Sequence, residues 1–130
     1  MKFRKYIFLL FLFYSYMPVL AQVDTAWVRH YNGPGNDLDE AVDLLVDDTG
    51  NVYITGSSWS EISLDFGTIK YAPNGETLWV RRYNGPLNTD DQAVALVVKN
   101  GYVYVTGLSL GMTTDIATVK YTLNGDTVWT

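Results

Sequence analysis

The sequence predicts an all-β fold made of tandem four-stranded antiparallel units, and three observations support this. Residues 27–34 and 79–86 are near copies that lie 52 positions apart, and a third copy begins at Trp129. Each copy continues through short runs rich in β-branched and aromatic residues, with turn residues between them. After residue 21, no stretch keeps a helical period. A repeat of this length indicates a unit that buries its apolar faces only against its neighbours.

Four strands are expected in each copy, joined as two hairpins. In the first copy, alternating apolar residues predict a strand over residues 39–46, and Asp-Asp-Thr-Gly-Asn then turns the chain into a return strand from Val52. A second hairpin joins residues 65–71 to 77–83 through Asn-Gly, a strong turn signal between β-rich runs. The second copy repeats this order from Asp91 onward.

Adjacent apolar residues within the strands, as in Leu44-Leu45-Val46, indicate strands that are buried on both faces. Four short antiparallel strands in about 50 residues are the unit of a β-propeller blade. A β-sandwich would instead show cleaner alternation of polar and apolar residues and no long period. The predicted fold is therefore a partial β-propeller of about two blades.

The repeated residues resemble a known family. The pattern Asp-x-x-Thr-Ile/Val-Lys-Tyr-x-x-Asn-Gly-x-Thr-x-Trp, then Val-Arg-Arg-Tyr-Asn-Gly-Pro and Val-Asp-Asp-Thr-Gly-Asn-Val-Tyr-Ile-Thr-Gly, is similar to the SBBP-type β-propeller repeat of bacteria and archaea. The resemblance extends over residues 27–130. It implies a secreted or surface propeller, often one module of a larger protein. It offers no shared catalytic residues to transfer to this chain.

The point in the repeat at which the chain begins gives the expected boundaries between its parts. Residues 1–21 are a signal peptide, 22–38 an N-terminal latch strand (26–31) and loop, 39–83 the first complete blade, and 84–130 a second blade truncated before its last strand. A closed ring needs at least about four blades. The chain is therefore expected to be the N-terminal fragment of a longer protein. The alternative is a short chain that completes its ring by self-association through its open blade edges.

The first 21 residues have the layout of a secretory signal. Lys2, Arg4 and Lys5 form a basic start, an apolar run follows, and residues 19–21 offer small side chains for cleavage before Gln22. The unbroken apolar run is short for a membrane-spanning helix, which needs about 20 residues. We therefore expect a cleaved signal, rather than an uncleaved membrane anchor, and a secreted, extracellular or cell-surface protein.

Composition restricts the partners and the chemistry. The chain has 9 basic and 14 acidic residues, and loss of the three basic residues of the signal would leave a net charge of −8. Nucleic acids and anionic membranes both need a basic face, so neither is an expected partner. Because the chain has no cysteine, disulfides, cysteine–histidine catalysis and cysteine-rich zinc sites are excluded.

Trp59 is the candidate ligand-binding residue. It lies in a loop that differs between the two copies, and loops of a rigid scaffold are where binding residues gather. The alternative is a tryptophan that only anchors its loop. By contrast, Trp27, Trp79 and Trp129 share one repeat position and are expected to pack between blades.

The acidic loops are a candidate calcium site. Their carboxylates belong to Asp37, Asp39, Asp90 and Asp91. Calcium prefers such oxygen ligands, but the loops lack the ligand spacing of a helix–loop–helix calcium site. Capping of strand entries and solvation are the alternative explanation.

No catalytic constellation is apparent, and no cofactor is predicted. His30 is the only histidine, and Arg82 takes its place in the second copy, which argues against a serine–histidine–acid triad. The predicted function is therefore a secreted module that offers a binding or scaffolding surface to a protein or glycan. The alternative is part of a secreted propeller enzyme, a glycan hydrolase or lyase, whose catalytic residues lie in blades outside this chain.

The signal prediction can be tested by export. The chain carried to the extracytoplasmic side should begin at Gln22, as read by mass spectrometry, because the residues at positions 19–21 suit a signal peptidase. Replacing Ala21 with arginine should leave the signal uncleaved. A wild-type chain that stays in the membrane fraction at its full mass would contradict the prediction.

Overall fold

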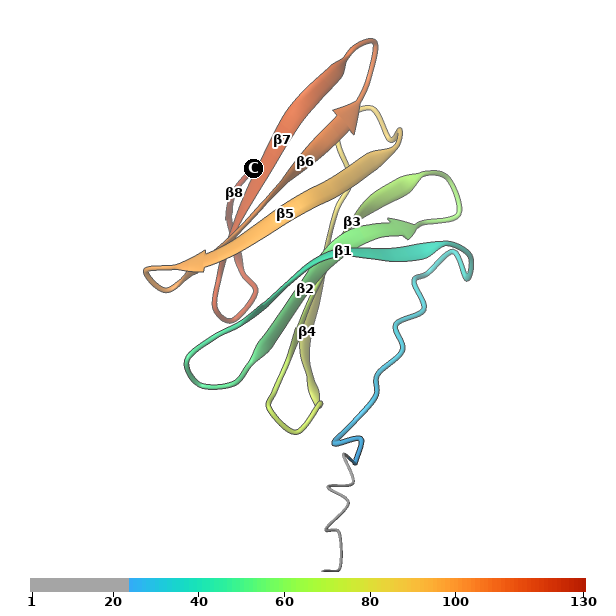
Figure 1. Cartoon of the computed structure of the whole chain (residues 1–130). Helices are drawn as coiled ribbons and strands as arrows, with labels where there is room; N and C mark the ends of the chain where they lie inside the picture. The colour runs from blue at the N-terminus through green and yellow to red at the C-terminus, as the bar shows by residue number, and fades with distance from the viewer. Residues whose placement is uncertain (1–23) are drawn as a thin grey trace, which may run out of the picture.

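A computed structural model describes residues 24–130, which form eight strands in two four-stranded antiparallel sheets (Figure 1). Sheet 1 contains β1 (Asp39–Val46), β2 (Val52–Trp59), β3 (Leu64–Tyr71) and β4 (Thr77–Tyr83). Sheet 2 contains β5 (Asp91–Lys99), β6 (Tyr102–Leu110), β7 (Thr114–Thr122) and β8 (Thr127–Trp129). In each sheet the strands lie in chain order, so every sequence neighbour pairs as a hairpin. The predicted all-β fold of two propeller-type blades is confirmed.

The hairpin turns adopt the backbone conformation that their residues favour. Asn100 and Gly101 both have positive φ, 53° and 80°, as a two-residue type I′ turn requires. The turn between β1 and β2 is built differently, around a carboxylate. Asp47 Oδ1 accepts hydrogen bonds from the backbone N–H groups of Thr49 and Asn51, each at 2.9 Å. The residues of the turn therefore set the strand register of the first hairpin in each sheet.

Both sheets have a β-bulge at the same repeat position. The register of sheet 1 slips between Ala41 and Asp43, and sheet 2 slips at the equivalent point. A Cβ at Gly56 would collide with the carbonyl oxygen of Glu40, and Gly107 is equally restricted in sheet 2. The bulged strand thus approaches its neighbour so closely that only glycine fits there.

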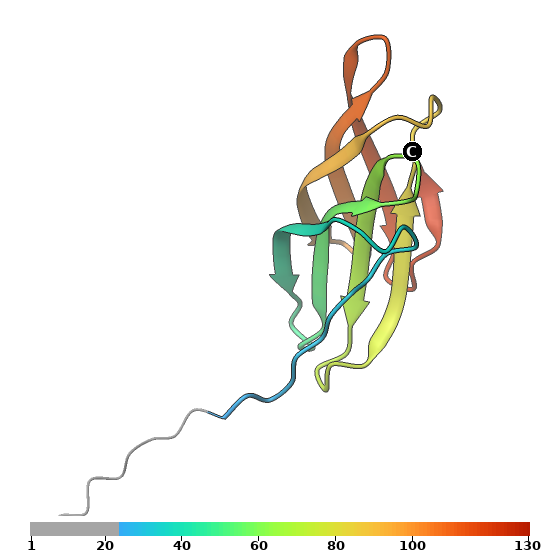
Figure 2. The same ribbon diagram turned by 90° about the vertical axis from the view of Figure 1, so that its right-hand side faces the viewer.

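The hydrophobic core lies between the sheets, which stack face to face (Figure 2). Sheet 1 contributes Tyr53, Phe66 and Trp79, and sheet 2 contributes Ala93, Leu96, Val103, Val105, Val119 and Tyr121. The rings of Tyr53 and Tyr121 lie on either side of Trp79, with centroids 6.2 and 6.1 Å from its ring. The prediction that Trp79 packs between blades is therefore confirmed.

Polar contacts fix how the sheets sit on each other. Trp79 Nε1 donates to the carbonyl oxygen of Leu123 at 3.0 Å, and Arg81 Nε donates to that of Gly125 at 2.6 Å. Both acceptors lie in the turn between β7 and β8. At the other side of the interface, the backbone N–H of Leu96 donates to Asp43 Oδ2 at 2.8 Å. These directional bonds add a defined orientation to an apolar interface that by itself has little directionality.

Residues 24–38 contain no strand, whereas the sequence predicts a latch strand over residues 26–31. The segment is extended along sheet 1 and makes the contacts that β4 makes with sheet 2. Trp27 Nε1 donates to the carbonyl oxygen of Pro73 at 3.0 Å, and Arg29 Nε donates to that of Gly75 at 2.6 Å. A strand needs a neighbouring strand to pair with, and among the described residues none lies beside this segment. The segment therefore lies where an outer strand would lie, but it pairs with no strand among the described residues.

The structure also differs from the expected end of the second blade. The last strand is present as β8, whose residues pair with Lys120 and Tyr121 of β7. In sheet 1, the equivalent pairing continues to Phe66 opposite Tyr83. Residues 114–119 of β7 thus have no outer strand beside them within the described range.

The predicted signal peptide, residues 1–21, lies outside the described residues. In residues 24–130, no helix is long and apolar enough to cross a membrane.

Replacing Phe66 with alanine should lower the free energy of unfolding by about 3–5 kcal/mol, because its fully buried ring fills the inter-sheet core. Met112 is the control, since its side chain is 94% exposed. Its replacement by alanine should change the free energy of unfolding by less than about 0.5 kcal/mol. Urea unfolding followed by tryptophan fluorescence measures both. Equal effects of the two substitutions would contradict the packing of the sheets.

Candidate functional site

The stacked sheets have two unlike ends. At one end, short turns join β1 to β2, β3 to β4, β5 to β6 and β7 to β8 (Figure 1). The opposite end, which we call the loop end, carries residues 32–38, 60–63, 84–90 and 111–113. Large apolar side chains are exposed there, belonging to Leu38, Ile62, Leu87, Leu110 and Met112. A concentration of exposed apolar side chains on loops is typical of an interaction surface.

Trp59 is the last residue of β2 and is half-buried at the loop end. Its backbone N–H donates to the carbonyl oxygen of Leu38 at 2.9 Å, and its own carbonyl accepts from the N–H of Gly35 at 3.1 Å. A Cβ at Gly35 would collide with the indole ring. Trp59 therefore anchors residues 32–38 to sheet 1 and keeps part of its ring exposed. A role in binding a ligand stays a prediction.

The connection between the blades is also held firmly at the loop end. Asp90 Oδ1 accepts a hydrogen bond from the N–H of Leu64 at 3.0 Å, which ties the connection to sheet 1. The carbonyl of Asp90 accepts from the N–H of Leu110 at 2.9 Å, and Thr89 Oγ1 donates to the carbonyl of Leu110, which ties it to sheet 2. The loop end is thus a fixed arrangement of loops, because both sheets hold its central segment.

The aspartates of the predicted calcium site have separate partners. Asp39 and Asp91 are repeat equivalents, and their Oδ2 atoms accept hydrogen bonds from the backbone N–H groups of Gly33 and Gly85 at 2.7 and 2.5 Å. Asp37 is exposed. In residues 24–130, no group of three or more histidine, cysteine, aspartate or glutamate side chains is placed to hold a metal ion. Calcium binding therefore stays a prediction for which the described structure assembles no ligand set.

Arg82 is the centre of a polar cluster in sheet 1 near the loop end. Its Nη2 atom lies 2.9 Å from Asp65 Oδ2, and the two side chains are 22% and 6% exposed. Nη1 donates to Ser58 Oγ at 2.5 Å and to the hydroxyl of Tyr31 at 3.4 Å, while Nη2 also donates to the carbonyl of Ser58 at 2.7 Å. The cluster joins β2, β3, β4 and the N-terminal segment. Its charge-assisted bonds give it a structural role.

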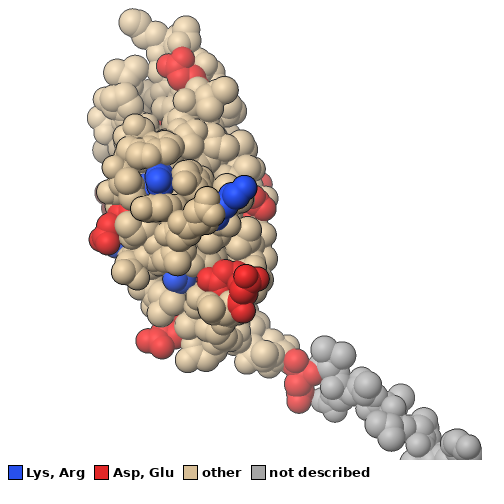
Figure 3. Space-filling view, turned by 90° about the vertical axis from the view of Figure 1, so that its left-hand side faces the viewer, with Lys and Arg blue, Asp and Glu red and all other residues tan. Residues whose placement is uncertain are grey.

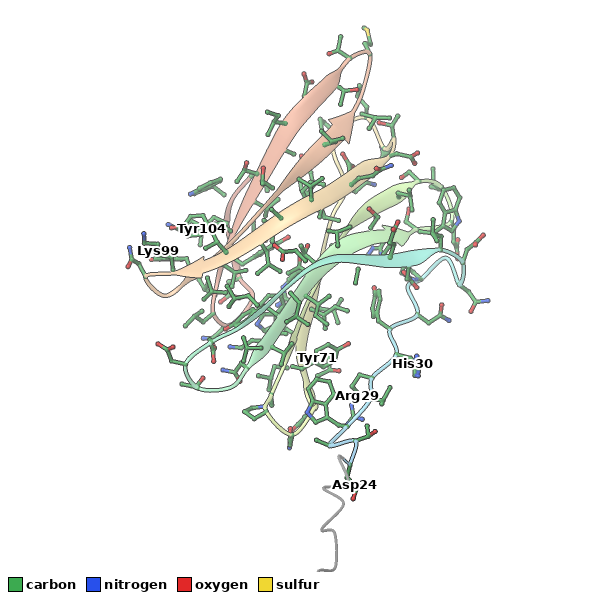
Figure 4. All side chains as sticks on the ribbon, in the orientation of Figure 1. Asp24, Arg29, His30, Tyr71, Lys99 and Tyr104 are labelled. Atoms are coloured by element: carbon green, nitrogen blue, oxygen red, sulfur yellow. The ribbon has the colours of Figure 1, made fainter. Side chains whose placement is uncertain are left out.

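Sheet 2 repeats this cluster only in part. Ser109 pairs with Asp115 as Ser58 pairs with Asp65. The position equivalent to Arg82 lies beyond residue 130, so the described part of sheet 2 contains only the serine and the aspartate of this cluster. In the N-terminal copy, the same repeat position is held by His30, which is exposed and points away from sheet 1 (Figure 4).

Three titratable groups with marked pKa shifts belong to the scaffold. Burial raises the pKa of Tyr121 to about 12, and burial together with the nearby Asp47 carboxylate does the same for Tyr53. Burial alone would raise the pKa of Asp47, but hydrogen bonds from Asn51 and Thr49 outweigh it and hold that pKa well below its usual range. Each cause lies in a sheet or hairpin turn and none at the loop end. The shifts therefore report packing and turn geometry, not an acid–base pair.

On the face shown in Figure 3, the charged side chains do not gather in one area. Acidic and basic side chains alternate there, and no basic patch covers that face. An electrostatic footprint for a polyanion would require such a patch.

Comparison with known proteins identifies the repeat. Residues 26–62 match a family model described as SBBP, a beta-propeller repeat. The chain carries an SBBP-type β-propeller repeat. The matched SBBP residues include the N-terminal segment, the loop that Trp59 anchors, β1 and β2, so they span the connection from one blade position to the next. No protein in the curated set matches the chain.

The SBBP scaffold places some residues as the sequence predicts and others not. Arg82 and Asp65 form their ion pair within sheet 1. Arg81 does reach the neighbouring blade, but it binds a backbone carbonyl. Ser58 and Tyr31 join the cluster without a prediction from sequence. The recurrence of serine at positions 58 and 109 is the signal that indicates a shared role.

The Arg82–Asp65 pair can be measured with a double-mutant cycle. Replacing Arg82 with alanine should lower the free energy of unfolding by about 2–3 kcal/mol, because the Asp65 carboxylate stays buried without its counter-ion. Replacing both residues should cost less than the sum of the single changes, by about 1 kcal/mol or more. Lys99→Ala, at an exposed hairpin position, is the control. Strict additivity of the single changes would contradict the pairing.

Proposed function

We propose that the chain is a secreted propeller module that uses its loop end to bind a protein or a glycan. The observation that supports this proposal is the contrast between the two ends of the blades. The hairpin end has short turns rich in Asn, Asp and Gly, and related turns recur in both copies. At the loop end, the loops over residues 60–63 and 111–113 differ in sequence between the copies, and five large apolar side chains are exposed.

The chemistry of the loop end suits such a partner. The partly buried indole of Trp59 combines an apolar ring with a polar N–H, which suits either a sugar ring or a protein side chain. Ile62 and Met112, 76% and 94% exposed, lie on other loops of the same end, and both sheets hold the connection over residues 84–90 in place. Fixed loops bind with less loss of conformational entropy than mobile ones. Export to the outside of the cell, as the predicted signal implies, would bring this end into contact with extracellular partners.

The enzyme alternative has no specific observation in its favour within residues 24–130. The Arg82 cluster is satisfied by its own hydrogen bonds, and the only histidine of the chain is exposed on the N-terminal segment. Catalysis by a larger protein that contained this module would therefore depend on residues elsewhere.

Binding can be tested with an affinity panel of polysaccharides and of extracellular proteins from the source cell, using the mature chain. Trp59→Ala should weaken the strongest interaction about tenfold or more, because aromatic anchors carry much of the energy of a binding surface. Asp48→Ser, at the hairpin end, is the control and should leave binding unchanged. A wild-type interaction that responds to Asp48→Ser and not to Trp59→Ala would contradict the assignment of the loop end.

A further inference from the structure

Asparagine followed by glycine occurs five times in the chain, each time outside the strands. The pairs are Asn32-Gly33, Asn74-Gly75, Asn84-Gly85, Asn100-Gly101 and Asn124-Gly125. Asparagine is a chemically labile residue, and a following glycine makes it more so, because glycine has no Cβ to keep its backbone nitrogen away from the asparagine side chain. The fold decides which of the five pairs can react.

The reaction of such a pair is an attack within the chain. The backbone nitrogen of the glycine loses its proton and bonds to Cγ of the asparagine, while the Cγ–Nδ2 bond breaks and ammonia leaves. Water then opens the resulting succinimide ring at either carbonyl carbon, which gives aspartate or isoaspartate. The reaction therefore requires a glycine N–H and an asparagine side chain that are free to approach each other.

In four of the five pairs, the glycine is buried and its N–H is bonded. Gly33 donates to Asp39 Oδ2 at 2.7 Å, and Gly85 donates to Asp91 Oδ2 at 2.5 Å. The N–H groups of the other two glycines, at positions 75 and 125, donate to the carbonyls of residues 72 and 122 at 2.8 and 3.0 Å. Each of these bonds must break locally before the nitrogen can react.

Three of the four asparagines in these pairs also have a bonded side chain. Nδ2 of Asn32 donates to Asn36 Oδ1 at 2.6 Å, and Nδ2 of Asn84 donates to Asn88 Oδ1 at 2.9 Å. Oδ1 of Asn74 accepts from the backbone N–H of residue 76 at 3.0 Å. These bonds hold the amide groups in place and oppose their rotation towards the glycine nitrogen.

The fifth pair, Asn100-Gly101, forms the turn between β5 and β6 and lacks this protection. Both residues are exposed, and within residues 24–130 neither the N–H of Gly101 nor the side chain of Asn100 has a hydrogen-bond partner. A Cβ built at Gly101 would have no atom within 4 Å. Lys99, the preceding residue, lies at the projecting tip of this hairpin (Figure 4). The turn therefore has room to rearrange.

This exposure is a property of the turn and not of the sheet face behind it. The corresponding turn of sheet 1, residues 47–51, belongs to a sheet over which sheet 2 is stacked. Asp48 and Thr49 at its tip are nevertheless exposed. That turn contains no Asn-Gly pair, so it offers no second site.

From this contrast we propose that Asn100 is a site of spontaneous deamidation, and that the fold protects the other four Asn-Gly pairs. The reactants are the chain itself and water. The site lies at the hairpin end, so it does not depend on the ligand binding proposed for the loop end.

The two products should affect the fold differently. Aspartate leaves the main chain unchanged, and Asp-Gly is itself a favoured pair for a type I′ turn. Isoaspartate adds the side-chain methylene to the main chain, so the two-residue connection between the paired residues Lys99 and Tyr102 becomes longer. Because β5 and β6 carry Leu96 and Val105 of the core, a disturbed turn should weaken the packing of sheet 2.

The rates at the five pairs can be compared in the folded and the unfolded chain. The mature chain is incubated at mildly alkaline pH, with and without urea, and peptide mapping by mass spectrometry measures the acid formed at each pair. In the folded chain, residue 100 should react at least about tenfold faster than the other four asparagines. In urea all five should react at similar rates, because each is followed by glycine and no hydrogen bond protects it. Asn100→Gln, which keeps an amide on a longer side chain, is the control and should form almost no acid at position 100.

Unfolding in urea tests the effect of the products. The isoaspartate fraction of the incubated chain, separated by ion exchange, should unfold at a lower urea concentration than fresh protein. Asn100→Asp should unfold as fresh protein does, because it has the new charge without the longer main chain.

Two outcomes would overturn the proposal. In the folded chain, acid could form at one of the other four pairs as fast as at residue 100. Alternatively, folding could slow the reaction at residue 100 as strongly as it slows the others. Loop-end binding is measured separately, and Asn100→Gln changes no residue of the loop end, so failure of one proposal is distinguishable from failure of the other.

Discussion

The structure depends on one constraint: each sheet is apolar on both faces and needs a neighbour on each side. The inter-sheet core meets this need once, with Phe66 and Trp79 of sheet 1 packed on sheet 2. Apolar contact alone would allow the sheets to slide, and Trp79 and Arg81 prevent this by donating to carbonyls of the next blade. The same pair of bonds recurs from Trp27 and Arg29, so in this chain it attaches each outer segment to a turn of the next sheet.

Within residues 24–130, each sheet has one face that the other sheet does not cover. Leu44 and Ile116 are exposed because no sheet among the described residues covers these faces. At the loop end, residues 89–90 join the two sheets, whereas the loops over residues 60–63 and 111–113 lie beyond the strands. The loops over residues 60–63 and 111–113 differ between the copies, and the loop end exposes apolar side chains, which is why we assign ligand binding to it.

The Arg82 cluster lies at a repeat position that carries different residues in different copies. In sheet 1, the guanidinium joins Asp65, Ser58 and Tyr31 and thereby links the N-terminal segment to three strands. Ser109 and Asp115 preserve two of these partners in sheet 2, and His30 is the residue that the N-terminal copy has in place of the arginine. In sheet 1 the cluster therefore connects the N-terminal segment with β2, β3 and β4.

The sequence by itself determined the repeat, the hairpins and the fold class, because alternation, Asn-Gly turns and a fixed period are local properties of the chain. It also indicated that Trp79 packs between blades, whereas Trp129, predicted to do the same, is 46% exposed among the described residues. Tertiary structure decided the rest. The pairing of Arg82 with Asp65 inside one sheet, the anchoring of residues 32–38 by Trp59, and the separate partners of Asp39 and Asp90 depend on register and on which loops meet. Residues 26–31 show the same limit: their β-type sequence makes a strand only when a second strand lies beside them, since the hydrogen bonds of a sheet are made between segments and not within one.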